Sequence, residues 1–134
     1  MLSKNKPKVA VVVITRNRVN VLKRCLRSLE KSAYKISEIV VVNNASIDRS
    51  VEMVKKNFPR VKLVLQNENV GAAEGRNIGA RVSKSELVYF LDDDAYIEQN
   101  TIKSAVETIL TDKNIAIVQS KVLSSINTKK ILGI

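Results

Sequence analysis

The sequence contains no histidine and only one cysteine. The absence of histidine excludes Ser-His-Asp and Cys-His catalytic groups, the common zinc sites and imidazole acid–base chemistry. Any catalysis by this chain must therefore rely on carboxylates, a hard metal ion or amides. The single cysteine, Cys25, excludes an internal disulfide and is typical of a reducing compartment, so we expect a cytoplasmic protein.

Long hydrophobic runs are also absent. The apolar run near the N-terminus, residues 9–14, is far too short to span a membrane, and no signal-peptide cleavage site accompanies it. With 134 residues, 45% of them hydrophobic and 27% charged, the composition is that of one ordinary globular domain. We therefore expect a single domain over residues 1–134, with residues 1–7 as a flexible tail. This length is small for a complete two-substrate enzyme.

The net charge of +10 is concentrated near the N-terminus, where residues 1–35 hold ten Lys or Arg and a single acid, Glu30. A basic patch of this kind suits nucleic acid, an anionic membrane surface or a phosphate-bearing substrate. The alternative is a solvated helix face. Apolar residues at helical spacing between residues 18 and 32 favour that alternative, because they place the basic residues Lys23, Arg24, Arg27 and Lys31 on the opposite face. Both interpretations remain open.

Strand-like and helix-like segments alternate along the chain. Apolar runs predict strands at residues 8–14, 39–42, 61–66, 86–91 and 115–120, and the segments between them predict helices near residues 18–32, 51–57, 72–82 and 100–110. Asn100 or Thr101 is expected to cap the last helix. This alternation indicates an α/β fold, a three-layer sandwich with a mostly parallel, Rossmann-like sheet.

Four polar clusters follow predicted strands: residues 15–18, 43–46, 67–71 and 92–94. In open α/β sheets, ligands bind outside the carboxyl ends of the strands. We therefore expect the four clusters to share one edge of the sheet. Uncharged groups such as those of the first two clusters suit a nucleobase or ribose. Ordinary turn and cap chemistry is the alternative explanation for them.

The cluster Asp92-Asp93-Asp94 follows a strand that should be buried. Side chains alternate along a strand, so Asp92 and Asp94 should point one way and Asp93 the other. Mg²⁺ or Mn²⁺ is typically held by one or two carboxylates together with substrate phosphates, which makes Asp92 and Asp94 candidate metal ligands. The alternative is a solvated acidic turn in which Asp93 or Asp94 caps the next helix.

Glycines 71, 75 and 79 are spaced by four, which matches neither the dinucleotide fingerprint nor a phosphate loop. On a helix they form one stripe, so packing against the sheet is the expected role of Gly75 and Gly79. Gly71, at the helix start, would let backbone amides approach an anion. Arg76 and Asn77 are candidate ligand contacts, with a salt bridge or solvent exposure as the alternative for Arg76.

The segments VVVITRNRVNVLKRCLRSL, EIVVVNNASIDRS, NENVGAAEGRNIGA and LVYFLDDDAYIEQN, in this order, resemble the family 2 glycosyltransferases with the GT-A fold. The resemblance implies a nucleotide-diphosphate sugar donor, a divalent cation (Mg²⁺ or Mn²⁺) on a DxD motif, and transfer with inversion. It places Asp92 and Asp94 at the metal and the sugar phosphate. It places Thr15, Asn17, Asn43 and Asn44 around the base and ribose, with Arg76 near the nucleotide. The remaining candidate substrate-binding residues are Gly71, Asn77 and Asp93.

The sequence departs from the family pattern in two ways. Asn43 stands where the family usually has an aspartate, so its contact to the nucleotide should be altered. The family also continues past a position like Ile134, into the part that binds the acceptor and carries the general base. With Glu98, Glu107 and Asp112 as the only later acids, no base can be named. We expect a fragment, or a donor-binding module that needs a partner or a second copy.

The acceptor, whether glycan, lipid or protein, is not readable from the sequence. Two alternatives to glycosyl transfer are a metal-dependent phosphoryl-transfer domain and a nonenzymatic basic module that binds nucleic acid or an anionic membrane. With a glycosyltransferase as the leading hypothesis, we expect no specific nucleic acid partner. Peripheral membrane contact through the basic N-terminal region is a further expectation.

Overall fold

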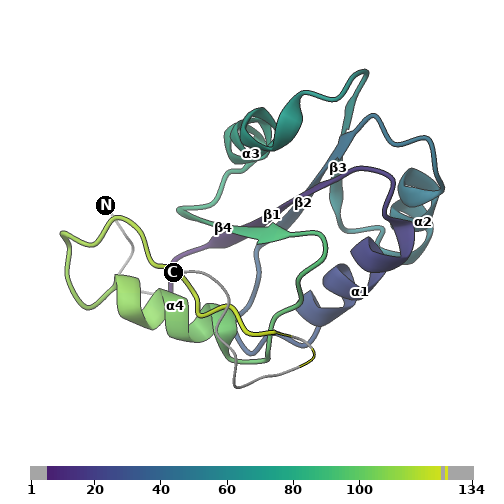
Figure 1. The fold of residues 1–134 in the computed structure, drawn as a ribbon. Coiled ribbons are helices and arrows are strands. Elements are labelled where there is room, and N and C mark those ends of the chain that lie inside the picture. The colour runs from purple at the N-terminus through teal and green to yellow at the C-terminus, as the bar shows by residue number, and fades with distance from the viewer. Residues whose placement is uncertain (1–5, 125, 127–134) are drawn as a thin grey trace.

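The computed structural model describes residues 6–124 and 126. It contains four parallel strands and four helices in regular alternation (Figure 1). In chain order these are β1 (Val9–Thr15), α1 (Val19–Leu29), β2 (Glu38–Asn44), α2 (Ser50–Asn57), β3 (Lys62–Gln66), α3 (Gly71–Val82), β4 (Leu87–Asp92) and α4 (Thr101–Ile109). The strands lie in the order β3-β2-β1-β4. This confirms the predicted α/β fold with a parallel sheet.

The sheet is covered on both faces, which gives three layers. One apolar cluster joins alternate residues of β1 to α1, α2 and α4, and a smaller cluster on the other face joins Val12, Val40 and Val42 to α3. Figure 1 shows α3 alone on one side of the sheet and the other three helices opposite. The β-branched run of β1 forms the centre because side chains of a parallel strand between two helical layers are buried on both faces.

Helix α3 lies close against the sheet because of its glycines. A Cβ at position 79 would lie 2.3 Å from Cγ1 of Val12, and a Cβ at position 75 would lie 3.1 Å from Ile14. The packing role predicted for Gly75 and Gly79 is confirmed, since a larger residue at position 79 would force helix and sheet apart.

The predicted fifth strand is wrong. Residues 115–120 have no strand pairing; the side chain of Ile117 is 87% exposed, and Ser120 contacts β4 through a 2.9 Å hydrogen bond from the hydroxyl of Tyr89. An apolar β-branched run becomes a strand only where its backbone pairs with a neighbouring strand, and this segment makes a side-chain contact instead. In the described part of the chain, β4 is therefore an edge strand.

The amphipathic character of α1 agrees with the sequence pattern. Leu22, Cys25, Leu26 and Leu29 are buried, whereas Arg24, Arg27 and Lys31 are exposed. No helix in the described ranges is long and apolar enough to cross a membrane. Contact of the basic face with an anionic membrane stays a prediction.

The two ends of the described chain differ from expectation in small ways. Residues 1–5 of the predicted N-terminal tail lie outside the described residues, whereas Pro7 is buried and its carbonyl accepts a 2.6 Å hydrogen bond from the hydroxyl of Tyr34. Asn100 occupies the N-cap position of α4, but its side chain makes no capping hydrogen bond.

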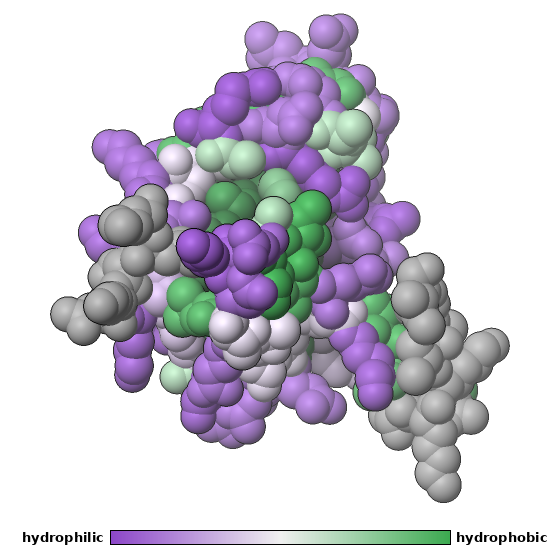
Figure 2. All heavy atoms as spheres, turned by 90° about the vertical axis from the view of Figure 1, so that its left-hand side faces the viewer, coloured by the Kyte–Doolittle hydropathy of each residue, from purple (hydrophilic) through white to green (hydrophobic). Residues whose placement is uncertain are grey.

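Because the strands are parallel, their carboxyl ends lie at one end of the sheet. We call this end, with Thr15, Asn44, Gln66 and Asp92 as the last strand residues, the rim. Figure 2 shows the face on the left of Figure 1, where the strands begin; there apolar side chains gather near the middle of a mostly polar surface. The polar clusters singled out in the sequence thus belong to the rim.

Candidate functional site

Three consecutive acids lie at the end of β4 and alternate in exposure. The side chains of Asp92 and Asp94 are 68% and 61% exposed, whereas Asp93 is buried. Asp92 is the last residue of the strand and the next two form a turn. Asp92 and Asp94 therefore present their carboxylates to solvent at the rim, and Asp93 turns inward.

Asp93 links two elements of the rim. Its carboxylate accepts a 2.9 Å hydrogen bond from the hydroxyl of Thr15, the last residue of β1, and lies 3.2 Å from the guanidinium of Arg18. Thr15 is itself buried. These contacts give Asp93 and Thr15 a structural role beneath the rim.

Each exposed acid has an arginine beside it. The guanidinium of Arg76 lies 2.8 Å from Oδ1 of Asp92, and that of Arg18 lies 3.3 Å from Oδ2 of Asp94. These pairs explain how like charges are accommodated so close together, and they give Arg76 the salt bridge that was one alternative for it. Each pair uses one of the two oxygens of its carboxylate.

The acids fit a divalent cation that is shared with a ligand. No group of three or more His, Cys, Asp or Glu that could hold a metal occurs in the part of the chain that the structure describes. One or two carboxylates are nevertheless the usual protein contribution to a Mg²⁺ site that includes substrate phosphates. The arginines beside them also suit the negative charge of a phosphate.

The end of β2 carries two buried amides. Asn43 pairs in register with Thr15 of β1, and both Asn43 and Asn44 are 4% exposed. The side-chain oxygens of both asparagines have no hydrogen-bond partner among the described residues. A buried polar atom without a partner is costly, so a hydrogen-bond donor to either of these two oxygens would stabilise the end of β2.

Of the candidates near α3, the structure ties Gly71 and Arg76 to the rim, but not Asn77. Gly71 has φ +81° and its carbonyl accepts a 3.2 Å hydrogen bond from Nδ2 of Asn44. The Gly71 N–H donates to Oδ1 of Asn69 at 3.0 Å, so this amide is already used locally. Asn77 instead lies 3.4 Å from Glu74 on the exposed side of the helix.

Asn17 and Asp48 join two loops of the rim. Oδ1 of Asn17 accepts a 2.7 Å hydrogen bond from the N–H of Ile47, in the loop after β2. Asp48, which sequence reasoning missed, accepts hydrogen bonds from the N–H of Val19 at 3.1 Å and of Ser50 at 2.9 Å. The position of Asp48, two residues before the start of α2, could have predicted its hydrogen bond to the N–H of Ser50. Nothing in the sequence predicted its hydrogen bond to the N–H of Val19.

Cys25 lies beneath the acids. Its thiol is 3.6 Å from the backbone carbonyl of Asp92. Burial, reinforced by the charges of Asp93, Asp94 and Asp92, raises the pKa of the Cys25 thiol to about 12. The thiol therefore stays protonated near neutral pH, which does not suit a nucleophile.

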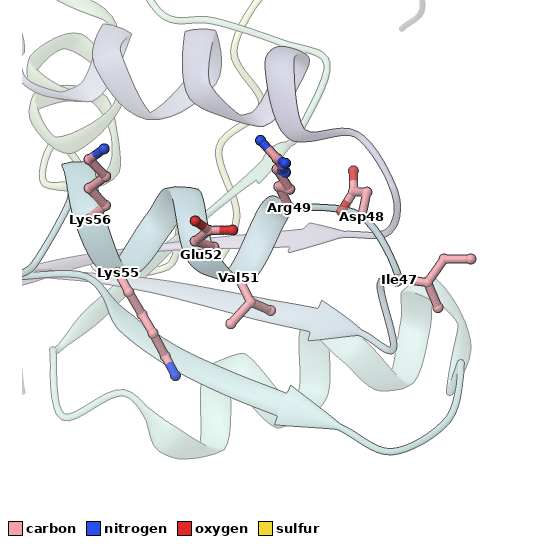
Figure 3. A pocket seen from close by; sticks show the side chains of 7 residues that line it. All are labelled: Ile47, Asp48, Arg49, Val51, Glu52, Lys55 and Lys56. Atoms are coloured by element: carbon pink, nitrogen blue, oxygen red, sulfur yellow. The ribbon is translucent and has the colours of Figure 1, made fainter.

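Of two surface hollows, one is lined in part by an acid from the end of β4, and the other is not. A hollow of about 720 Å³ lies on α2 and is lined by Ile47, Asp48, Arg49, Val51, Glu52, Lys55 and Lys56 (Figure 3). Figure 3 shows these side chains spreading outward in different directions from α2 and the loop before it. A smaller hollow, of about 410 Å³, is lined by Asn20, Val21, Arg24 and Asp94 and so adjoins the rim. We place the site at the rim because the buried amides and the acids converge there.

Comparison with known proteins agrees with this geometry. The model of glycosyl transferase family 2 matches residues 10–132. Glycosyltransferase GlyA of Streptococcus pneumoniae is 36% identical over 77% of this chain and 15% of its own length. The crystal structure of S. aureus TarS has a TM-score of 0.69 and 31% identity, over 76% of this chain and 32% of that chain. Mannosyltransferase PcManGT from Pyrobaculum calidifontis has a TM-score of 0.74 and 28% identity, over 84% of this chain and 34% of that chain.

These matches cover most of this chain but only part of its relatives. The chain spans 12% to 36% of the length of the curated relatives that it matches. The likeness to TarS and PcManGT identifies the sheet and its helices as the GT-A type of α/β fold. The family model covers far more than half of the sequence, so the chain belongs to glycosyl transferase family 2.

Proposed function

We propose that this chain binds a nucleotide-diphosphate sugar at the rim and serves as the donor-binding part of a glycosyltransferase. The observation that carries the proposal is the convergence, at one end of the sheet, of two exposed carboxylates, two arginines and two buried amide oxygens without partners among the described residues. A nucleotide-diphosphate sugar has the complementary groups: a charged diphosphate and a nucleoside rich in hydrogen-bond donors.

Asp92 and Asp94 would hold a divalent cation, Mg²⁺ or Mn²⁺, whose charge neutralises the diphosphate. Two carboxylates facing a diphosphate without a cation would repel it. Arg18 and Arg76 lie beside these acids and would keep the ligand phosphates oriented. The related mannosyltransferase PcManGT was solved in complex with GDP-Man and Mn²⁺, which supports a divalent cation in this family.

Asn43 and Asn44 would contact the nucleoside. Their buried oxygens can accept hydrogen bonds from ribose hydroxyls or base N–H groups. S. aureus TarS was crystallised in complex with UDP-GlcNAc and PcManGT in complex with GDP-Man, so relatives of this chain bind donors with different bases. The base that this chain prefers is therefore left to experiment.

Calorimetry on the chain provides the test. UDP, GDP, CDP and ADP are titrated in the presence of Mn²⁺ and again in excess chelator, and we expect one of them to bind only with the cation. Asp94→Ala should weaken that binding by about tenfold or more, because even the outer-shell partners of metal ligands contribute on this scale. Glu107→Ala, an exposed acid of α4, is the control and should bind like the wild type.

Two results would contradict the proposal. Affinity of Asp94→Ala equal to that of the wild type in Mn²⁺ would remove the carboxylate from the site. Failure of all four nucleotides to bind would remove the donor site itself. Where transfer to an acceptor is obtained, we expect inversion at the anomeric carbon, as the family resemblance implies, and product NMR would establish it.

A further inference from the structure

Two helices of the rim begin without a capping side chain of their own. The N-cap residues of α1 and α2 are Arg18 and Arg49, and neither makes a side-chain cap hydrogen bond. Arginine has donors only and cannot accept from the first N–H groups of a helix. The unpaired N–H groups at a helix start need an acceptor from elsewhere.

One carboxylate supplies that acceptor to both helices. Oδ2 of Asp48 accepts from the N–H of Val19, the first residue of α1, and Oδ1 accepts from the N–H of Ser50, the first residue of α2. Burial alone would raise the pKa of Asp48, but the hydrogen bonds from Ser50 and Val19 outweigh it and hold the pKa below its ordinary value. A negative charge at two helix N-termini is also favoured by both helix dipoles.

A second side chain ties the same two loops together. Asn17 has φ +53°; its N–H donates to Oγ of Ser46 at 2.9 Å, and its Oδ1 accepts from the N–H of Ile47 at 2.7 Å. In the other loop, Ala45 also has φ +53°. Left-handed backbone at residues other than glycine is unfavourable and persists only where surrounding contacts hold it.

The joined loops flank the proposed nucleoside site. They follow directly on Thr15 and Asn44, the last residues of β1 and β2, and Thr15 pairs in register with Asn43. If the loops separated, the buried amides at the end of β2 would become exposed and their positions less defined. A shift of about 1 Å at a binding site is enough to cost a large factor in function.

We propose that Asn17 and Asp48 are positioning residues that hold the loops after β1 and β2 as one rigid wall of the nucleotide site. This revises the expectation that Asn17 contacts the base or ribose, because its side-chain oxygen is occupied by the backbone of the neighbouring loop. The inference rests on the proposed function for the identity of the ligand. The hydrogen bonds that join the two loops are observed independently of the proposed function.

Substitution of Asn17 separates positioning from direct contact. Asn17→Asp keeps the accepting oxygen for Ile47 and tolerates the left-handed backbone, but it has no side-chain N–H to offer a ligand. Asn17→Gly also tolerates that backbone but lacks the oxygen. We expect the affinity for the preferred nucleotide with Mn²⁺ to fall about tenfold in Asn17→Gly and to stay within about threefold of wild type in Asn17→Asp. Asn114→Gly, in the loop after α4, is the control.

Amide hydrogen exchange measures whether the hydrogen bonds between the two loops are present, and it needs no ligand. The N–H of Ile47 should exchange at least about tenfold faster in Asn17→Gly, and the N–H of either Val19 or Ser50 should do so in Asp48→Asn. Asn at position 48 offers one accepting oxygen, so it can cap only one helix. Unchanged protection of core amides such as those of Val12 and Val41 would show that each variant is folded.

The outcomes are distinct. Asn17→Asp binding as weakly as Asn17→Gly, with the Ile47 amide still protected, would show that the asparagine amide contacts the ligand and would overturn the proposal. Wild-type affinity in Asn17→Gly and Asp48→Asn, with their amides exposed, would overturn it too. A wild-type chain that binds no nucleotide would remove the proposed function, whereas hydrogen exchange would still report whether these side chains hold the loops.

Discussion

The hydroxyl of Thr15 donates a 2.9 Å hydrogen bond to the carboxylate of Asp93, and both residues are buried. The two residues are 78 positions apart in sequence and lie at the ends of adjacent strands. The middle acid of the cluster is therefore part of the interior, whereas its two neighbours face solvent. The three acids should consequently respond differently to substitution.

We predict that Asp93→Ala destabilises the fold, whereas Asp92→Ala does not. Asp93→Ala leaves the buried hydroxyl of Thr15 without its partner, which should lower the free energy of unfolding by about 1–3 kcal/mol. The exposed pair of Asp92 with Arg76 should contribute less than about 1 kcal/mol. Urea unfolding measures both. Equal destabilisation by the two substitutions would contradict the division of roles.

The glycines of α3 provide a second pair of substitutions. Gly79→Ala would place a Cβ 2.3 Å from Val12 in the sheet, and we expect it to cost about 3 kcal/mol or more. Gly71→Ala meets open space but must adopt φ +81°, which should cost about 1 kcal/mol. Thermal or urea unfolding should rank them in this order. The reverse order would mean that α3 can move away from the sheet at little cost.

Most of the fold could be predicted from the sequence because its signals are local. The buried apolar run of β1 and the helical spacing of α1 each specify an element without reference to distant residues. The alternating exposure of Asp92, Asp93 and Asp94 agrees with the alternation expected along a strand, although β4 ends at Asp92 and the next two residues form a turn. Since the strands are parallel, the position of the polar clusters at the rim follows as well.

The rest depends on contacts between distant residues. Asp48 caps α1 from a position 29 residues away, and no local pattern encodes this. The hydrogen bond from the N–H of Ile47 to Oδ1 of Asn17 likewise joins two loops 30 residues apart, which no local pattern predicts. Residues 115–120 have the composition of a strand, but whether their backbone pairs with the edge strand β4 depends on contacts that the sequence does not reveal.

Asn43→Asp tests whether the end of β2 contacts the nucleotide. Asn43 is buried, its side-chain oxygen has no partner among the described residues, and the family resemblance places an aspartate there. A carboxylate can only accept hydrogen bonds, whereas the amide can also donate. We therefore expect a changed ranking of UDP, GDP, CDP and ADP in calorimetry, by about tenfold for at least one of them, which is a discrimination of about 1.4 kcal/mol. An unchanged ranking in a folded variant would remove Asn43 from the site.

Glu38, at the opposite end of the sheet from the rim, predicts how the stability of the fold changes at acid pH. At the start of β2, its carboxylate accepts hydrogen bonds from the hydroxyl of Ser85 at 2.6 Å and from the N–H of Lys84 at 2.9 Å. The hydrogen bond from Ser85, aided by that of Lys84 and by the charges of Lys62 and Lys84, outweighs burial and lowers the pKa of Glu38 below 4.5. The folded state therefore holds the charged form more strongly than the unfolded chain does.

The sign of the pH effect follows from this pKa. As the pH falls below about 4.5, the unfolded chain takes up a proton at Glu38 before the folded protein does, so the stability that Glu38 contributes is progressively lost. Above that pH it is fully present. Glu38→Gln should lower the free energy of unfolding by about 1 kcal/mol at pH 7, because its hydrogen bonds are weaker. Its stability should also fall less steeply than that of the wild type between about pH 5 and 3, roughly the range in which carboxylates titrate. Urea unfolding across that range, with Glu98→Gln as the control at an exposed acid, makes the comparison. Parallel pH profiles for the wild type and Glu38→Gln would show that Glu38 does not link the start of β2 to the loop before β4 in solution.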